Sequence, residues 1–567
     1  MYKNNTVELL QSKLDQMVPV IYLLSEDEHR TILGIKNITQ KSNNRFQTEI
    51  FVYKTTTGIV SIVDYEHEID EKKCPINTET ADINHALIHI HRQNKKDRRQ
   101  VYIMTEADQL LDDAQVVRRV KDFAVQADNS DSNLKIVVLL SSRLFLPSKL
   151  EKYVDVVTYP YPSDDEVKAI IAEWIGKFNE AAKKSGKSIE VRTDFEIVNA
   201  LKGLIVPQIH QALSACINIT KKAGQPKLDA VVLNKLKREA INKTSYLKFR
   251  EPQLSFKDVG GLGRLKKWMN IMRGGWTNDG REFGLPPIKG VLLLGLPGCG
   301  KTRICEALAN EWQLNFLEFD PSKVYSSRVG ESEGNMHLTL ARVDSMAPCI
   351  LFIDEIEKGF AGIQSSSMSD AGTTARTISI FLVWMNNEQS FVFVAATCNN
   401  IYFMPPELIS RFDELFYIAP PSVVEREEIL RIQIREKQRD DTKLDCSALA
   451  RVSSNLSGRE IRQAVNEAMY VAFQQHQIDG KTDLNNQVLT ESLRRKIPIV
   501  KTMQKQLEYL IKWVGYDKTQ RDGVRARFAN NEVDELDTMF TEILEKQSDK
   551  DNSCSGPQQP QFPFSDA

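Results

Sequence analysis

The chain has 567 residues, enough for roughly three or four domains, with 41% hydrophobic and 26% charged residues and a formal net charge of −2 at pH 7. This balance lacks the basic excess typical of nucleic-acid-binding proteins, and no run of about 18 apolar residues is available for a membrane span. The eight cysteines form no C-x-x-C pair, which argues against a zinc site or a disulfide framework. The first residues carry no apolar signal sequence, so we expect a cytoplasmic protein.

The first 245 residues contain a pattern that returns later in the chain. An apolar strand at 135–140 leads to Pro147-Ser148-Lys149-Leu150, just as the strand at 391–396 leads to Pro406-Glu407-Leu408. A repeat on this scale indicates a duplicated domain, so we predict an α/β domain at 1–245. The alternative is an unrelated α/β domain in which the pattern recurs by chance.

This first domain lacks a phosphate-binding loop. Its opening strand, at 18–24, is followed by Ser25-Glu26-Asp27-Glu28, which has three acids and no glycine. Carboxylates repel phosphate, and no lysine stands where a phosphate loop requires one. We therefore predict that the domain does not bind ATP and serves in partner binding or assembly.

Residues 295–302 match G-x-x-x-x-G-K-[ST], the phosphate-binding loop of nucleoside triphosphatases. An apolar run at 291–294 precedes them and a run without Gly or Pro at 303–312 follows, so the loop is predicted to join a strand to a helix N-terminus, which favours an anion. Lys301 is expected to reach the β- and γ-phosphates and Thr302 to hold Mg²⁺. The predicted ATP-binding residues of this segment are Leu296, Pro297, Gly298, Cys299, Gly300, Lys301, Thr302 and Arg303.

Two further strand ends carry polar residues suited to hydrolysis. The apolar strand at 349–353 ends in Asp354 and Glu355, and the strand at 391–396 is followed by Asn399. Ligands of such folds lie at the carboxyl ends of parallel strands. We expect Asp354 to orient the Mg²⁺ shell, Glu355 to act as general base on the attacking water, and the amide of Asn399 to place that water.

The motifs occur in the order used by AAA ATPases. These are Asp258-Val259-Gly260-Gly261, the phosphate loop, Ile353-Asp354-Glu355, Ala395-Ala396-Thr397, Arg411-Phe412-Asp413 and Leu456-Ser457-Gly458-Arg459-Glu460. Over about residues 250–475 the chain resembles this family. The resemblance implies an AAA+ P-loop NTPase core at 246–430 with a C-terminal helical lid at 431–497, preceded by a degenerate AAA-like α/β domain.

The resemblance also implies roles for single residues. Val259 and Gly260 would lie near the adenine, and Gly458 would abut the nucleotide. Asn399 resembles the sensor-1 amide, although Cys398 is inserted before it and makes Asn400 a second, weaker claimant.

Arg411 resembles an arginine finger that reaches the γ-phosphate of a neighbouring subunit. A finger in trans implies a homo-oligomer, a hexameric ring when ATP is bound. The segment before Arg411 is shorter than in many AAA members, which usually carry a second arginine there.

In the lid, Ser457 and Glu460 have the spacing of a capping box. Arg459 and Arg462 either contact phosphate or belong to a solvated helix face.

AAA motors that thread proteins present an aromatic-aliphatic-Gly pore loop. The matching residues here are Arg328, Val329 and Gly330. A guanidinium in place of the aromatic ring can grip carboxylates, phosphates or backbone carbonyls.

One subfamily is a closer match. Residues 354–362, the Ser-rich segment 365–369 and residues 381–385 resemble the "hypothetical chloroplast reading frame" AAA proteins of plastids and cyanobacteria. This implies a bacterial cytosol or plastid stroma as the location. Beyond the lid, an amphipathic helix with Val500, Leu507 and Val514 predicts a helical extension at 498–546, and the Ser/Gln/Pro-rich tail at 547–567 is predicted to be disordered.

The function that these patterns favour is an ATP-hydrolysing, Mg²⁺-dependent ring that remodels a protein complex, with a protein substrate that the sequence does not identify. A nucleic-acid-handling ATP switch is the second hypothesis, motivated by Arg328 and the basic run at 521–527. A scaffold whose assembly is controlled by ATP is the third.

Overall fold

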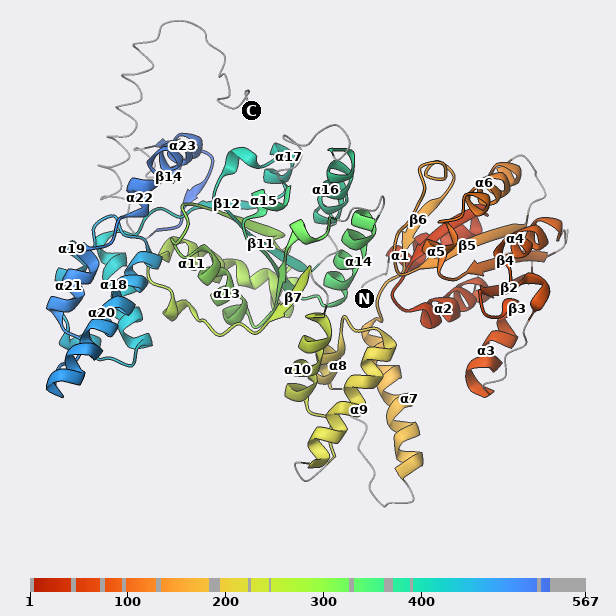
Figure 1. Ribbon diagram of the computed structural model, residues 1–567, viewed down its shortest axis with the longest axis horizontal. Helices are drawn as coiled ribbons and strands as arrows, with labels where there is room; N and C mark the ends of the chain where they lie inside the picture. Colours follow the sequence, from red (N-terminus) through yellow and green to blue (C-terminus); the bar gives the residue numbers. More distant parts are fainter. Residues whose placement is uncertain are drawn as a thin grey trace, which may run out of the picture. The chain divides into compact units, whose positions relative to one another are not determined.

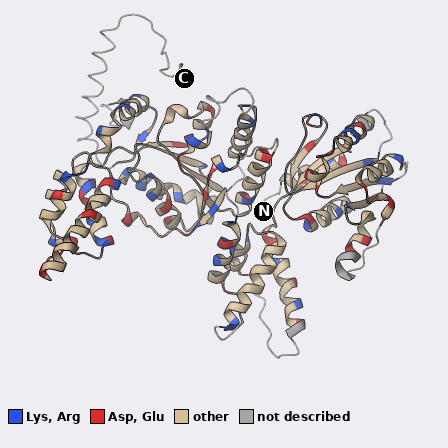
Figure 2. Ribbon diagram, in the orientation of Figure 1, with Lys and Arg blue, Asp and Glu red and all other residues tan. Residues whose placement is uncertain are grey.

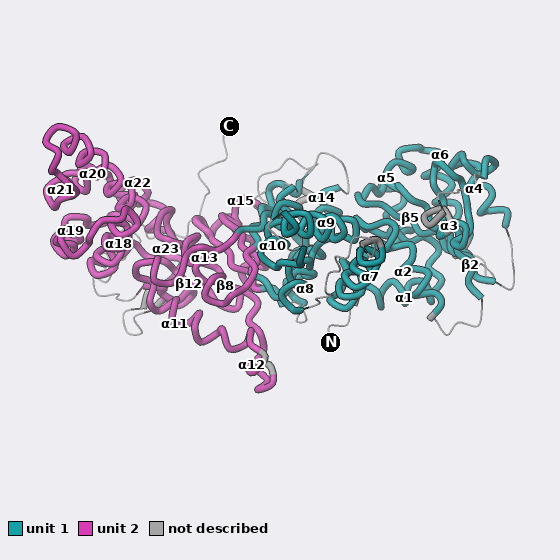
Figure 3. Tube along the Cα trace, turned by 90° about the horizontal axis from the view of Figure 1, so that it is seen from below, with its two compact units in different colours: residues 1–250, 317–349, 362–392 teal, residues 251–316, 350–361, 393–567 magenta. Residues whose placement is uncertain are grey.

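Figure 1 shows the protein as a computed structural model, which describes residues 5–41, 47–71, 77–93, 98–128, 134–182, 194–222, 226–243, 246–325, 331–360, 371–387, 391–517 and 522–530. The chain divides into two compact units, drawn in two colours in Figure 3. Unit 1 comprises residues 1–250, 317–349 and 362–392, and unit 2 comprises residues 251–316, 350–361 and 393–567. The first division lies close to the predicted boundary at 245, whereas two segments of the predicted ATPase core belong to unit 1.

Unit 1 contains a six-stranded sheet of β1 (Val20–Leu24), β2 (Gln47–Lys54), β3 (Gly58–Ser61), β4 (Arg98–Met104), β5 (Lys135–Ser141) and β6 (Asp155–Thr158). The strand order is β3-β2-β4-β5-β1-β6. β1 pairs in parallel with β5 and β6, and β4 pairs in parallel with β2 and β5, whereas β2 and β3 are antiparallel. β1 is buried along its whole length, as expected for a parallel strand that is covered on both faces.

Alternate side chains of β1 enter two separate apolar cores, because successive residues of a strand point to opposite faces. Val20, Tyr22 and Leu24 join a core with residues of α4 (Ile83–Arg92), α5 (Ala107–Leu110) and α6 (Ala114–Asp128). Ile21 and Leu23 join a core with residues of α1 (Asn5–Asp15), α2 (Glu28–Lys41) and α3 (Ile62–Glu71). The sheet is therefore the middle of three layers.

The acids after β1 accept hydrogen bonds from other parts of unit 1. The Glu26 carboxylate accepts a hydrogen bond from the Tyr161 hydroxyl at 2.8 Å and forms an ion pair with Arg342. Arg342 lies on α14 (Glu331–Ser345) and is only 5% exposed. The Asp27 carboxylate accepts from the backbone N–H of Val206 at 2.9 Å. Where a phosphate loop would place glycines, this domain thus has carboxylates that are satisfied by protein donors.

Four helices follow this sheet in unit 1: α7 (Asp164–Ala182), α8 (Phe195–Leu201), α9 (Val206–Lys222) and α10 (Ala230–Ile241). α10 packs against α8 and α9. It carries Lys237, whose side chain is fully buried and donates to the backbone carbonyl of Asn199 at 2.9 Å. Burial disfavours the charged ammonium and lowers the pKa of Lys237 to about 7.

We expect Lys237→Met to stabilise the protein near pH 7. In the unfolded chain the lysine pKa is about 10.4, so between pH 7 and pH 10 the unfolded state binds more protons than the folded state. The free energy of unfolding of the wild type therefore rises with pH across this window. Methionine has no charge to bury, so the variant is expected to be more stable at pH 7, with part of the gain offset by the lost hydrogen bond to Asn199, and this advantage shrinks towards pH 10.

Thermal unfolding at pH 7 and pH 9.5 checks this expectation. Lys235→Met is the matched control, because Lys235 lies exposed on the same helix. Equal pH dependence in the wild type and in Lys237→Met would contradict it.

The second sheet has seven strands: β7 (Leu247–Arg250), β8 (Gly290–Leu294), β9 (Asn315–Phe319), β10 (Cys349–Ile353), β11 (Val392–Cys398), β12 (Glu414–Tyr417) and β15 (Arg527–Phe528). Their order is β15-β12-β8-β11-β10-β9-β7. β8 pairs in parallel with β11 and β12, and Leu294, Cys398 and Tyr417 lie in register at its end. The carboxyl ends of these strands thus meet at one edge of the sheet, the edge at which parallel α/β sheets bind ligands.

Along the chain, helices stand between the strands of this sheet. They are α11 (Gly263–Met272), α12 (Asn278–Phe283), α13 (Lys301–Trp312), α14, α15 (Ile356–Phe360), α16 (Ala371–Met385) and α17 (Pro406–Ile409). α13 begins at the lysine of the phosphate-loop motif, within the predicted strand–loop–helix unit. The mixed α/β architecture of an AAA+ P-loop core is therefore present, as the sequence predicts.

The lid consists of α18 (Val423–Glu436), α19 (Cys446–Val452), α20 (Gly458–Asp479) and α21 (Asn486–Arg494). The predicted capping box of α20 is present: the Ser457 hydroxyl accepts from the N–H of Glu460, and the Glu460 carboxylate accepts from the N–H of Ser457 at 2.8 Å. Both acidic and basic residues occur along these helices (Figure 2), and Arg435 pairs with Asp441 at 2.8 Å.

After the lid, α22 (Ile499–Thr502) and α23 (Gln504–Val514) divide the predicted amphipathic helix at Met503. Three short strands follow, β13 (Tyr516–Asp517), β14 (Asp522–Gly523) and β15, so the extension is only partly helical. The predicted disordered tail at 547–567 lies outside the described residues. Among the helices that the structure describes, none has both the length and the apolar character needed to cross a membrane.

Candidate active site

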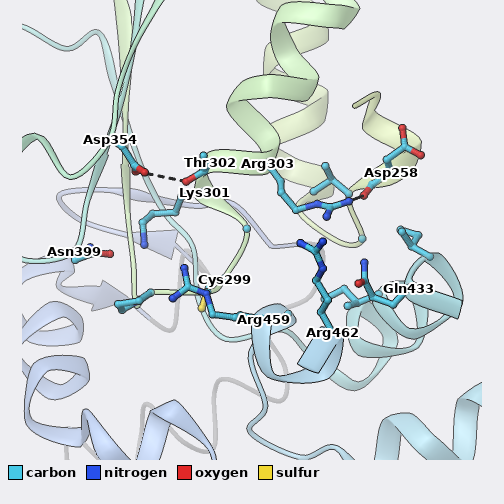
Figure 4. A pocket seen from close by; sticks show the side chains of 18 of the residues that line it. Asp258, Cys299, Lys301, Thr302, Arg303, Asp354, Asn399, Gln433, Arg459 and Arg462 are labelled. Carbon is cyan, nitrogen blue, oxygen red and sulfur yellow. Dashed lines mark hydrogen bonds between the residues drawn. The ribbon is translucent and has the colours of Figure 1, made fainter. Parts of the chain in front are cut away.

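A pocket of about 280 Å³ in unit 2 collects most of the predicted site residues, and its size lies near the lower end of small-molecule sites. Figure 4 shows it from close by. The predicted residues that line it are Val259, Gly260, Pro297, Gly298, Cys299, Gly300, Lys301, Thr302, Arg303, Asp354, Glu355, Asn399 and Gly458.

Two of the predicted residues, Leu296 and Arg411, do not line this pocket. Leu296 belongs to the loop but is fully buried, and Arg411 lies elsewhere in unit 2. Arg328, Val329 and Gly330 lie outside the described residues.

Two of the phosphate-loop glycines sit where a side chain would clash. Gly295 has φ of 154° and Gly298 has φ of 88°. A Cβ added at Gly295 would lie 2.4 Å from the carbonyl oxygen of Ile418, and one at Gly298 would lie 2.9 Å from the Cβ of Arg459. These positions therefore require glycine for close backbone approach.

Lys301 points back onto its own loop. Its ammonium donates to the backbone carbonyls of Gly295 at 2.7 Å and Leu296 at 2.9 Å, and the residue is only 7% exposed. Burial lowers its pKa. The two carbonyls hold the ammonium against the backbone of the phosphate loop.

Thr397 joins the two acids after β10 to β11. Its hydroxyl donates to Asp354 Oδ1 at 2.5 Å and accepts from the backbone N–H of Glu355 at 2.9 Å. The Thr302 hydroxyl lies 3.5 Å from the same Asp354 oxygen (Figure 4). Two oxygen atoms that could bind a metal ion, the Thr302 hydroxyl and the Asp354 carboxylate, are thus adjacent at the edge of the pocket.

This donor set fits Mg²⁺, which takes few protein ligands and completes its octahedral shell with water and phosphate oxygens. Among the described residues, no group of three or more His, Cys, Asp or Glu side chains is arranged to hold a metal. A site built from one hydroxyl and one carboxylate is consistent with a metal that arrives with a nucleotide.

Glu355 and Asn399 form a pair across two strand ends. Asn399 Nδ2 donates to Glu355 Oε1 at 2.8 Å. Glu355 has φ of 49°, in the left-handed region that non-glycine residues rarely adopt and that is often found at functional sites. Its carboxylate also pairs with Lys358, whose pKa it raises. Asn400, the weaker claimant, instead accepts from the N–H of Tyr402 at 3.2 Å as a helix cap.

Comparison with known proteins identifies the family. Residues 291–420 match the model "ATPase family associated with various cellular activities (AAA)" and residues 6–159 match "SpoVK-like AAA ATPase, N-terminal domain". A Guillardia theta protein named "Uncharacterized AAA domain-containing protein ycf46" is 33% identical over 411 residues, which cover 72% of this chain and 78% of that protein. The chain belongs to the AAA ATPase family.

Proteins of the same name from Pyropia yezoensis and Trieres chinensis are each 29% identical to this AAA ATPase, over 422 and 416 residues that cover 73% of the chain and 81% and 80% of the relatives. The suspected resemblance to the plastid reading-frame proteins is confirmed. The N-terminal domain is AAA-like, so the alternative of an unrelated α/β domain is not supported.

The lid of the AAA ATPase contributes residues that the sequence analysis left open or did not name. The side chains of Arg459 and Arg462 both line the pocket (Figure 4), and the Arg459 N–H donates to the carbonyl of Gly298 at 3.1 Å. Ile429, Ile432 and Gln433 line it from α18. Their spacing along one face of a predicted helix is the signal that could have located them.

Arg303 has a different set of partners from that expected. Its guanidinium donates to the carbonyl of Asp258 at 3.1 Å and to the Glu436 carboxylate at 2.6 Å. It therefore ties α13 both to the segment before Val259 and to α18 of the lid, while its side chain still lines the pocket.

Proposed function

We propose that this AAA ATPase binds and hydrolyses ATP in the pocket and works as an oligomeric, hexameric ring that remodels a protein complex. The observation that carries the proposal is the pairing of Glu355 with Asn399 directly beside the phosphate loop. A carboxylate and an amide side by side can take a proton from a water molecule and hold that water in place.

In the proposed arrangement the phosphates of ATP lie on the 295–302 loop, and the adenine ring lies against Val259, Ile429 and Ile432. Lys301 exchanges its two carbonyl contacts for the phosphate oxygens, which offer an anionic partner in place of neutral ones. Thr302 and Asp354 would hold Mg²⁺, which when bound neutralises phosphate charge. Glu355 accepts the proton of the attacking water while Asn399 orients it.

The ring is supported by the position of Arg411. This residue is absent from the lining of the pocket of its own chain, although the family resemblance makes it the finger that contacts the γ-phosphate. An arginine that acts in trans requires a second subunit at each active site, and closed symmetry is the usual way to give every site such a neighbour.

ATP turnover per subunit should therefore rise with protein concentration. The experiment measures phosphate release across a concentration series, and particle mass in the presence of ATP, ADP or no nucleotide. We expect assembly with ATP, and we expect turnover to rise over the same concentration range. Turnover that is independent of concentration, together with a constant monomer mass in every nucleotide state, would contradict the ring.

A further inference from the structure

The C-terminal extension makes a direct contact with the catalytic pair in unit 2. From α23, Gln506 Nε2 donates to the backbone carbonyl of Asn399 at 2.8 Å. Asn399 is the residue whose side chain donates to Glu355. One side chain of the extension thus lies two hydrogen bonds from the proposed general base.

The other backbone group of Asn399 is fixed as well. Its N–H donates to Glu357 Oε1 at 2.9 Å, and Glu357 is only 4% exposed on α15. With its N–H held by Glu357 and its carbonyl held by Gln506, the peptide on each side of Asn399 has a fixed orientation. The direction of the Asn399 side chain is set by that backbone.

The extension is itself anchored close to the nucleotide pocket. β15 pairs in parallel with β12, which neighbours the strand that leads into the phosphate loop. Asn530 is 1% exposed, donates to the Glu425 carboxylate at 2.7 Å and accepts from the N–H of Ala419 at 2.9 Å. These contacts attach the last described residues of the extension to the strand and helix that lead into the lid.

We propose that Gln506 is a positioning residue for ATP hydrolysis: it holds the Asn399 backbone, and through it the Asn399–Glu355 pair, in the geometry that orients the attacking water. This inference rests on the proposed hydrolysis at the pocket. It gives the C-terminal extension a role in the chemical step, although none of the extension's described residues lines the pocket.

The test measures kcat and KM for ATP in the full chain carrying Gln506→Ala or Gln506→Glu. Glutamate keeps the shape of the side chain but cannot donate when ionised. We expect both variants to lower kcat about fivefold, the size of one hydrogen bond that matters in the transition state, with KM unchanged. Gln506→Lys retains an N–H donor and should recover part of kcat.

Gln504→Ala is the matched control, because Gln504 is exposed on the same helix and pairs only with Glu508 in the described contacts. Its kcat should equal that of the wild type. A kcat of Gln506→Ala within twofold of the wild type, in a protein that loses turnover on Asn399→Ala, would overturn this inference alone. A parallel loss of kcat and melting temperature that Gln506→Lys fails to restore would reduce the residue to a structural one. Absence of turnover in the wild type would overturn the proposed function together with this inference.

Discussion

Replacement of Glu355 by Gln is expected to lower ATP turnover by about 10²–10⁴-fold, the usual contribution of a general base, while ATP binding is kept. Glutamine has nearly the same shape, and its carbonyl oxygen can still accept the hydrogen bond from Asn399. It cannot take a proton from water. The loop residues that would bind the phosphates are untouched, so the variant should accumulate in the ATP-bound state.

Phosphate release and the binding of a fluorescent ATP analogue check the two halves of this expectation. Glu407→Gln is the control, since Glu407 is exposed on α17 and does not line the pocket. Turnover of Glu355→Gln close to that of the wild type would exclude Glu355 as the base. The same variant, loaded with ATP, is the form in which a bound protein substrate should be retained and from which ADP should release it.

Arg411→Ala is expected to lower ATP turnover by about 10³–10⁵-fold, the range found for arginine fingers. The residue lies between α17 and β12, and its Nε is buried without a hydrogen-bond partner in the described structure. The side chain is partly exposed and has no ion-pair partner among the described residues, so we expect its guanidinium to meet a phosphate of another subunit. Arg411→Lys keeps the charge but loses the planar fork, so we expect only partial activity.

Mixing two inactive variants separates action in trans from action in cis. A ring assembled from Arg411→Ala and Glu355→Gln subunits contains interfaces at which an intact Glu355 meets an intact Arg411. We expect turnover to reappear on mixing and to be highest near equal amounts. If turnover did not recover at any ratio, in a mixture shown by mass to contain mixed oligomers, Arg411 would act in the active site of its own chain.

The features predicted from the sequence are those encoded by neighbouring residues. The phosphate loop, the strand that ends at Asp354 and the capping box of α20 each occupy a single short segment, so local pattern and backbone chemistry locate them. The sequence shows Thr397 as part of a family motif but does not predict its hydrogen-bond partners. Its two hydrogen bonds to Asp354 and Glu355 depend on the pairing of strands that are more than 40 residues apart in the chain.

The contact of Gln506 with Asn399 spans 107 residues. No periodicity or composition marks this glutamine among the other polar residues of its helix. Arg303 shows a second limit: its place next to the loop is evident from the sequence, whereas its pairing with Glu436 depends on how the lid closes over α13.

The ion pair between Glu26 and Arg342 would make it costly to turn the segment after β1 into a phosphate loop. Arg342 is nearly inaccessible to water, and removing its carboxylate would leave a buried guanidinium unpaired, a change that costs about 3–5 kcal/mol. A substitution of Glu26 by glycine, as in a glycine-rich loop, would lower the stability of the protein by this amount. Glu26, the acid that we expect to repel phosphate, is also the acid that pairs with α14, so phosphate binding at this place and the attachment of α14 are mutually exclusive uses of one position.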